Sequence, residues 1–377
     1  MRVLFTSCPD ESAFPSMVPL AQALDAAGHE VRVACRPRFA DVVTQAGLTA
    51  VPVGRDHDVW QAFGVEPGER AALRAAMLEP YDVVGQDERY ITWEYLRSGY
   101  EYHVTWWHKM DNLPVISQLV AHAQDWRPDL VIWEPTSYAG PVAAKAVGAA
   151  HARLLSSLDI HGVTRGHFLR LGQRRQDDPL AEWLSGYATK YGTSFSEDMV
   201  TGQLTIDQLP GSLRLDTGLP SLPMRHTPWR ETSQRFGRQR VAVVMDIEPT
   251  VRFGGYRLTV DEITAAVAQP DSGECAAVVH DGDLATFLDA VRHGLPQLVL
   301  PVYVDQPPLA DRIVECGAGL HIHPHTVTAA AVRDSVSRLL HEPSFRDSAA
   351  KLRDEMLTMP APAEVVPRLE ELAATHR

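Results

Sequence analysis

Short apolar segments alternate with helix-forming segments along most of the chain, and this alternation restricts the fold more than any other feature. In the first fifty residues, RVLF at 2–5 is followed by the helix-forming PLAQALDAA at 19–27 and by EVRVAC at 30–35. The same order returns over 113–147 and again over 241–316. Apolar strands that alternate with helices predict parallel sheets with helices on both faces. The chain is therefore expected to be an α/β protein.

The alternation weakens over residues 207–240, where several prolines interrupt a polar stretch. A chain of 377 residues also divides more readily into two domains than one. We therefore predict a Rossmann-like domain over 1–206, a linker over 207–240 and a second Rossmann-like domain over 241–377. Ligands of open α/β sheets bind at the carboxyl ends of the strands, so functional residues are expected in the loops over 7–16 and 280–286.

Composition excludes several partners. The 35 basic residues against 48 acidic ones give a net charge of −13, without a basic stripe, so no nucleic-acid partner is expected. The sequence has neither a signal-peptide pattern nor an apolar run of about eighteen residues, which predicts a cytoplasmic protein that does not bind membranes.

The four cysteines are scattered, and His103 and His108, five residues apart, would not share a face of an α-helix. No metal site is predicted.

Segments from both halves of the chain carry a resemblance to one family. They include MVPLAQALDAAGHEVRVA at 17–34, WRPDLVIWEP at 126–135, RLDTGL at 214–219, HGLPQLVLP at 293–301 and PAEVVPRLEEL at 362–372. Together they resemble the GT-B glycosyltransferases that attach deoxysugars to macrolides and anthracyclines in actinomycete antibiotic pathways, and the desosaminyl-transferase-like branch in particular. The resemblance implies two doubly wound Rossmann-like domains facing a cleft, with the final helix packing back on the N-terminal, acceptor-binding domain.

The resemblance also implies a reaction and its partners. A deoxysugar would pass from a thymidine-diphosphate (TDP) sugar to a polyketide aglycone, with inversion of the anomeric centre. The nucleotide sugar is a co-substrate, and no separate cofactor is implied. Members of this branch often need a cytochrome-related helper protein bound to the N-terminal domain, and a homodimer is a further partner arrangement that the resemblance leaves open.

The family's catalytic base is a His in the loop after the first strand, and Ala13 stands at the corresponding position. Asp10 and Glu11 in the same loop are candidate replacements, because burial in a closed cleft raises the pKa of a carboxyl group toward neutral pH. The alternative is that both are solvated turn residues. Asp159, in a segment that the resemblance places beside the acceptor pocket, is a third candidate base.

The family's diphosphate clamp reads HHGGAGT, in which glycines let the backbone approach the phosphates at the start of a helix. Residues 280–286 read HDGDLAT, so His280, Gly282 and Thr286 are retained while aspartates replace a histidine and a glycine. Because carboxylates repel a diphosphate, weakened donor binding is expected. The alternative is that one aspartate caps the following helix.

Two further features concern the C-terminal domain. Asp305 and Gln306 match the family's sugar-contacting residues, with a helix cap as the alternative reading of Asp305. Between VAVVMD at 241–246 and CAAVVH at 275–280, the chain is short by about thirty residues, the size of one strand-helix unit. The C-terminal domain is therefore expected to be shortened.

Aromatic residues gather over 92–110, where Trp93, Tyr95 and Trp106 offer apolar faces and polar tips suited to a flat polyketide. A helix core is the alternative explanation. Further candidates for contact with the acceptor are Phe14, Trp133 and His161.

Two functions remain open at this point. The overall resemblance favours a transferase. The missing His, the altered clamp and the missing unit favour a homologue that no longer transfers sugar and acts as an auxiliary protein or as a non-glycosylating enzyme on the polyketide.

Overall fold

The structure is a computed structural model that describes residues 1–6, 13–56, 79–173, 177–229, 240–245, 258–268, 274–301 and 305–376. It contains two sheets, in which every paired strand is parallel to its neighbour. The first has the order β3-β2-β1-β4-β5-β6-β7 and the second β11-β10-β9-β8. The strands are β1 (Arg2–Thr6), β2 (Glu30–Cys35), β3 (Thr49–Pro52), β4 (Leu130–Trp133), β5 (Ala150–Leu154), β6 (Leu204–Asp207), β7 (Ser221–Pro223), β8 (Val241–Val244), β9 (Ala277–His280), β10 (Gln297–Val299) and β11 (Gly319–His321).

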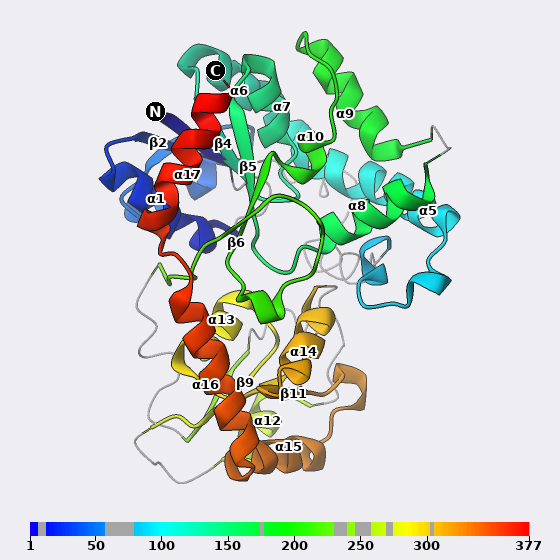
Figure 1. Ribbon diagram of the computed structural model, residues 1–377, viewed down its shortest axis with the longest axis vertical. Coiled ribbons are helices and arrows are strands. Elements are labelled where there is room, and N and C mark those ends of the chain that lie inside the picture. The colour runs from blue at the N-terminus through cyan, green and yellow to red at the C-terminus, as the bar shows by residue number, and fades with distance from the viewer. Residues whose placement is uncertain are drawn as a thin grey trace.

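Helices surround both sheets and form two lobes, one above the other in Figure 1. The helices of the first lobe are α1 (Phe14–Ala26), α2 (Ala40–Gln45), α5 (Trp93–His103), α6 (Lys109–Trp126), α7 (Ala139–Val147), α8 (Ile160–Leu171), α9 (Pro179–Lys190) and α10 (Asp198–Thr201), with the short turns η2 (Pro37–Phe39), η3 (Tyr81–Val83), η4 (Glu88–Tyr90), η5 (Val104–His108) and η6 (Gly211–Leu213). Those that follow in the chain are α12 (Val260–Val267), α13 (Leu284–His293), α14 (Gln306–Glu315), η7 (Pro324–Thr326), α15 (Ala329–His341), α16 (Pro343–Thr358) and α17 (Pro362–Thr375).

The α/β prediction is confirmed, and apolar sequence explains the strands. Val3, Leu4 and Phe5 of β1 are fully buried, because β1 lies in the middle of the sheet with helices on both faces. Helix α1 begins at Phe14, five residues before the predicted start at Pro19. Pro15 fits into the first turn of this helix, because the N–H groups there have no partner within the helix. Strand β7, within the segment 207–240 predicted as a linker, pairs with β6 and continues the first sheet.

The last helix of the chain returns to the first lobe. Val365, Val366 and Leu369 of α17 share a core with Leu20 and Leu24 of α1. In Figure 1 the chain runs from α16 against the second sheet up to α17 beside the N-terminus. The two lobes are therefore connected twice, once after β7 and once between α16 and α17.

The second sheet is small. Its four strands place β8 directly beside β9, and α12 is the helix that the described residues show between them along the chain. Helix α12 begins with a capping box, in which Thr259 and Glu262 each satisfy a backbone N–H of the other. Over the residues that the structure describes, the sheet of the C-terminal lobe has four parallel strands, and the shortening of this domain stays a prediction.

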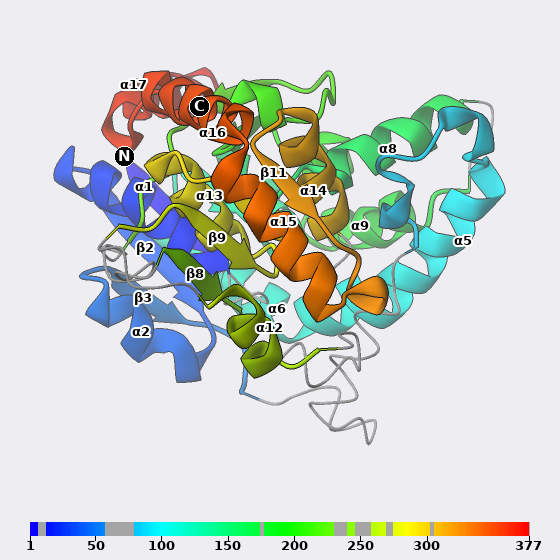
Figure 2. The same ribbon diagram turned by 90° about the horizontal axis from the view of Figure 1, so that it is seen from below.

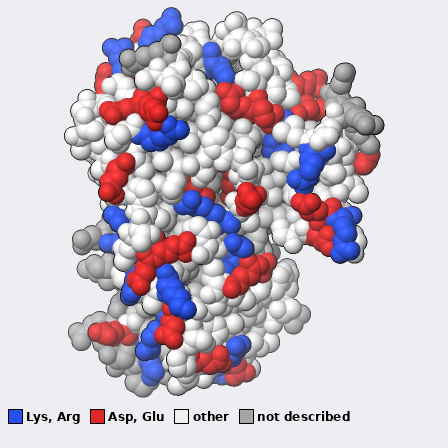
Figure 3. Space-filling view, in the orientation of Figure 1, with Lys and Arg blue, Asp and Glu red and all other residues white. Residues whose placement is uncertain are grey.

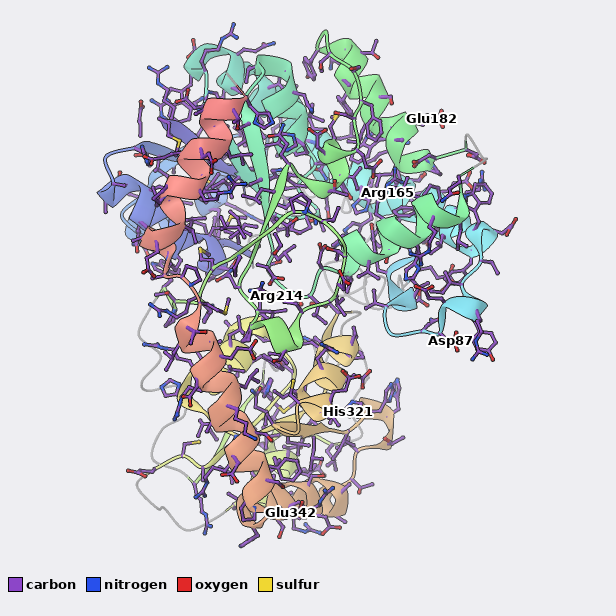
Figure 4. The ribbon with its side chains drawn as sticks, viewed as in Figure 1. Asp87, Arg165, Glu182, Arg214, His321 and Glu342 are labelled. Atoms are coloured by element: carbon purple, nitrogen blue, oxygen red, sulfur yellow. The ribbon has the colours of Figure 1, made fainter. Side chains whose placement is uncertain are left out.

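The two lobes also touch directly. Ser212 in η6 donates from its hydroxyl to Glu355 of α16 at 2.6 Å, and Arg312 of α14 donates to the Ser212 carbonyl at 2.8 Å. Arg214, next in this segment, lies at the junction between the lobes in Figure 4. Figure 2 shows the molecule from below, with α13, α14 and α15 of the second lobe in front of the first lobe.

The surface carries both charges. In Figure 3 acidic and basic side chains are interspersed over the visible face of both lobes. None of the helices in the described ranges combines the length and the apolar composition needed to cross a bilayer.

Candidate functional site

The carboxyl ends of the first sheet bring several polar side chains together. Ala13, where the family has its base, is buried at the start of α1. The loop after β4 reaches the end of β1, because the hydroxyls of Thr6 and Ser137 lie 3.1 Å apart. The predicted bases Asp10 and Glu11 lie outside the described residues.

Asp159 is engaged by its neighbours. Arg153, which is fully buried at the end of β5, donates to the two carboxylate oxygens of Asp159 at 3.0 and 2.7 Å. The backbone N–H of Gly162 donates to the same carboxylate at 2.8 Å, so Asp159 also caps α8. This is the geometry of a buried ion pair that holds a helix start. A role as base would require Asp159 to exchange these partners for the acceptor hydroxyl.

Two buried carboxylates at strand ends were missed by the sequence analysis. Glu134 follows β4 and accepts from the backbone N–H of Thr136 at 2.9 Å and from its hydroxyl at 2.6 Å. Asp207 ends β6, where burial raises its pKa to about 6 and the nearby charge of Asp159 adds to the effect. A carboxylate at the end of an apolar strand was the signal that could have found both.

Histidines and tyrosines form a buried cluster next to these strand ends. The π-helical turn η5 separates α5 from α6, and its wider turn brings His103 and His108 to a ring-centroid distance of 4.9 Å. The expectation that these two histidines would not share a face is therefore wrong, because it assumed an unbroken α-helix. His108 Nε2 lies 2.9 Å from the Tyr81 hydroxyl, and the His161 ring lies 4.4 Å from the Tyr81 ring.

Three side chains of the cluster, His108, His161 and Tyr81, are uncharged at neutral pH. Burial lowers the pKa of His161 to about 3 and lowers the pKa of His108 well below its ordinary value, and neighbouring histidines make smaller contributions in the same direction. Burial also raises the pKa of Tyr81 well above 10. Within the described ranges, Nδ1 of His108 and Nδ1 of His161 have no hydrogen-bond partner. Neutral imidazoles with open positions suit hydroxyl and keto groups of an uncharged ligand.

The predicted acceptor contacts lie in four places. His161 belongs to the cluster. Trp93 stacks on Phe168 at 6.1 Å, and the Tyr95 hydroxyl donates to Asp82 at 2.6 Å, both in the same helical layer. Trp106 is exposed on the outer surface. The two remaining candidates are in the sheet cores: Trp133 is fully buried beside His151, and Phe14 packs edge-on against Phe39.

A cavity of about 620 Å³ opens between α5, η5 and α9. Trp183, one of its lining residues, stacks on His108 with a ring-centroid distance of 6.4 Å. Trp183 therefore separates this cavity from the histidine cluster. No group of three or more potential metal ligands occurs in the described part of the chain.

The start of α13 in the second lobe carries the altered clamp motif. Asp283 caps the helix, because its Oδ2 accepts from the backbone N–H and from the hydroxyl of Thr286, both at 3.0 Å. The backbone N–H of Asp283 donates in turn to Asp281, which is buried. A carboxylate thus occupies the helix start, where a diphosphate would otherwise accept from the backbone.

His280 is also used by the fold. Its Nε2 lies 2.8 Å from the Gln297 amide oxygen, and its Nδ1 accepts from the Gly282 N–H at 3.1 Å. Burial lowers the pKa of His280 to about 4, so the ring is neutral. Gly282 has a φ of +96°, and a Cβ there would lie 3.1 Å from Gln306, which explains why this glycine is retained.

Gln306 and Asp305 lie at the start of α14. The contact between Gln306 and Gly282 shows that the predicted sugar-contacting pair is adjacent to the clamp motif. Asp305 makes no side-chain hydrogen bond to the start of α14. The helix-cap alternative is therefore not supported by this geometry.

Comparison with known proteins finds two family matches in succession along the chain. Residues 22–234 match the family described as Erythromycin biosynthesis protein CIII-like, N-terminal domain, and residues 260–372 match the corresponding C-terminal domain. The chain is 37% identical over 428 residues to 10-deoxymethynolide desosaminyltransferase of Streptomyces venezuelae, covering 100% of this chain and 98% of that protein. It is 36% identical over 423 residues to erythronolide mycarosyltransferase of Saccharopolyspora erythraea, covering all of both chains. These alignments are longer than the 377 residues present, so the relatives carry residues that this chain lacks.

Solved structures agree. The glycosyltransferase VinC in complex with dTDP superposes with a TM-score of 0.83 at 32% identity, covering 100% of both chains. The spinosyn forosaminyltransferase SpnP superposes with a TM-score of 0.77 at 33% identity, covering 99% of both. The predicted GT-B fold and the predicted resemblance are confirmed. The chain belongs to the erythromycin biosynthesis protein CIII-like family of glycosyltransferases.

Proposed function

We propose that this chain transfers a deoxysugar from a TDP-sugar to a polyketide aglycone, with inversion at the anomeric carbon. The observation that supports this most is the arrangement of the two lobes. Helix α1, which follows the base loop, and helix α13, which carries the clamp motif, both lie beside the segment after β7. An acceptor in the first lobe and a donor in the second would therefore meet at this junction.

The reaction is a single displacement. A carboxylate takes the proton from an aglycone hydroxyl, the oxygen forms a bond to the anomeric carbon, and the bond from that carbon to the diphosphate breaks to release TDP. Attack opposite the leaving group inverts the centre. We propose Asp10 or Glu11 as the base, with Asp159 as the alternative once it is released from Arg153.

The donor would be held by the clamp motif over 280–286 and by Asp305 and Gln306. Asp283 occupies the helix start and would repel the diphosphate, so we expect weak donor binding and a high donor KM. On the acceptor side, the uncharged cluster around Tyr81, His108 and His161 suits a neutral polyketide.

A second candidate function is favoured by the same helix start. If the Asp283 cap excludes the diphosphate, the chain does not transfer sugar and acts as an auxiliary protein or directly on the polyketide. This candidate predicts that the aglycone binds without nucleotide and that no glycoside forms.

The test is product formation with the substrates of a relative. The chain is incubated with 10-deoxymethynolide and TDP-desosamine, with and without a cytochrome-related helper protein, and the products are separated by mass. The proposal predicts a glycoside, an equal amount of TDP, and an anomeric configuration opposite to that of the donor.

The control is the Streptomyces venezuelae relative in the same assay. An Asp305→Ala variant is expected to lose most of the product, because it removes the proposed sugar contact. If the relative forms glycoside and this chain binds the aglycone without forming any, the second candidate is correct and transfer is excluded for this pair.

A further inference from the structure

One short segment lies between the two lobes and contacts both. It runs from Met224 to Trp229, directly after β7. His226 in this segment is buried, and its Nε2 lies 3.7 Å from Oδ1 of Asp289, a buried carboxylate in the middle of α13. The segment therefore contacts the helix whose first turn carries the clamp motif.

The same segment reaches α1 in the other lobe. Nδ1 of His226 lies 3.4 Å from the Gln208 side-chain oxygen, and the Gln208 amide donates to the carbonyls of Ser16 at 3.4 Å and Leu155 at 3.3 Å. The Trp229 ring packs edge-on against Phe14, the first residue of α1, with centroids 5.5 Å apart. Two independent contacts thus connect the segment to the first turn of α1.

We propose that His226 is a positioning residue that couples the donor helix α13 to the acceptor helix α1. Helix α13 moves as a rigid element, so a shift of its first turn when donor binds also shifts Asp289. The two side chains already contact each other at 3.7 Å in the unliganded chain, and an approach of about 1 Å would shorten this contact to a hydrogen bond. His226 and Gln208 would transmit that approach to Ser16 in the first turn of α1.

The polar composition of this contact supports coupling over simple packing. A buried imidazole beside a buried carboxylate costs desolvation energy that an apolar pair would not. At the same junction, Ser212 and Glu355 already connect the lobes through an exposed contact. The buried His226–Asp289 pair differs from this contact, because Asp289 belongs to the helix that carries the clamp motif and His226 connects through Gln208 to α1.

The test uses hydrogen exchange of the whole, unliganded chain, read separately for α1 and α13. Asp289→Asn, a change in the second lobe, is expected to raise exchange in α1 of the first lobe by about fivefold to tenfold, the size of a modest coupling between sites. His226→Phe should do the same. In the double variant the effect should not increase further, because both changes break one connection.

The matched control is His321→Phe. His321 Nε2 lies 3.5 Å from Oδ1 of Asp311, a similar pair on the exposed surface of the second lobe, and His321 is labelled there in Figure 4. This variant should leave hydrogen exchange in α1 unchanged. His226→Asn, a smaller change that keeps a polar side chain, provides the same comparison if His226→Phe fails to fold. Unchanged α1 exchange in the Asp289 and His226 variants, or additive effects, would overturn the proposal.

Only the catalytic readout rests on the proposed function. In an active chain, His226→Asn should lower kcat about tenfold, because the acceptor hydroxyl is misplaced relative to the donor, while the donor KM stays within about twofold. If no chain forms glycoside, the exchange measurement still decides the coupling. A failure of the proposed coupling can therefore be distinguished from a failure of the proposed transferase function.

Discussion

Replacing Asp283 by glycine is expected to tighten the binding of thymidine diphosphate by about tenfold. The change removes a carboxylate from the helix start and frees the backbone N–H of Thr286, which now donates a hydrogen bond to Asp283. A like charge about 4 Å from a phosphate costs on the order of 1 kcal/mol or more near a solvated surface, and 1.4 kcal/mol corresponds to tenfold. Calorimetric titration of both chains with TDP measures the difference.

The loss of the cap is a side effect that needs its own control. Thr328 caps α15 in the same lobe by accepting from the Ala331 N–H, and Thr328→Gly should leave TDP binding unchanged. Asp→Gly at a helix start costs only a few tenths of a kcal/mol in stability, so both variants should fold. Equal or weaker TDP binding by the Asp283 variant would show that this carboxylate does not obstruct the diphosphate.

Asp159→Ala is expected to destabilise the chain by about 3–5 kcal/mol, because it leaves the buried Arg153 guanidinium without its carboxylate. The cap of α8 is lost at the same time. Urea unfolding followed by circular dichroism measures the free-energy difference.

A surface pair provides the comparison. Glu342 pairs with Arg338 in α15 with both side chains about half exposed, and Glu342→Ala should cost less than about 1 kcal/mol. If Asp159→Ala costs no more than this control, the ion pair is not structural and Asp159 is available as a base. Asp159→Asn separates the roles further, since a base is lost in this variant while much of the packing remains.

Alternating sequence patterns predicted the architecture well because strands and helices are local. EVRVAC at 30–35 is β2 to the residue, and CAAVVH at 275–280 contains β9. The start of α1 was placed too late, because Pro19 was taken as a beginning although it lies inside the helix. The turn η5 was missed because one extra residue in a helical turn leaves little trace in the sequence.

Features of the candidate site could be predicted from the sequence where all the residues involved belong to one short segment. A cap by one of the two aspartates of the motif followed from the preference for aspartate at a helix start and was stated as an alternative, and the structure shows that Asp283 is the cap. The Arg153–Asp159 pair depends on a strand and a loop folding back on each other, and His226 meets Asp289 only because two lobes pack together. Contacts of this kind are set by tertiary structure, so residue types and spacing did not reveal them.

Because Asp283 already accepts from the first turn of α13, we expect this helix start to hold a diphosphate poorly. Calorimetric titration of the unmodified chain with TDP and with thymidine monophosphate tests it most directly, because the two ligands differ only in the phosphate that the clamp would hold. We predict that TDP binds less than about tenfold more tightly than the monophosphate, or less than about 1.4 kcal/mol. A preference of about a hundredfold or more would contradict the claim, since it would mean that the clamp grips the diphosphate despite its carboxylates.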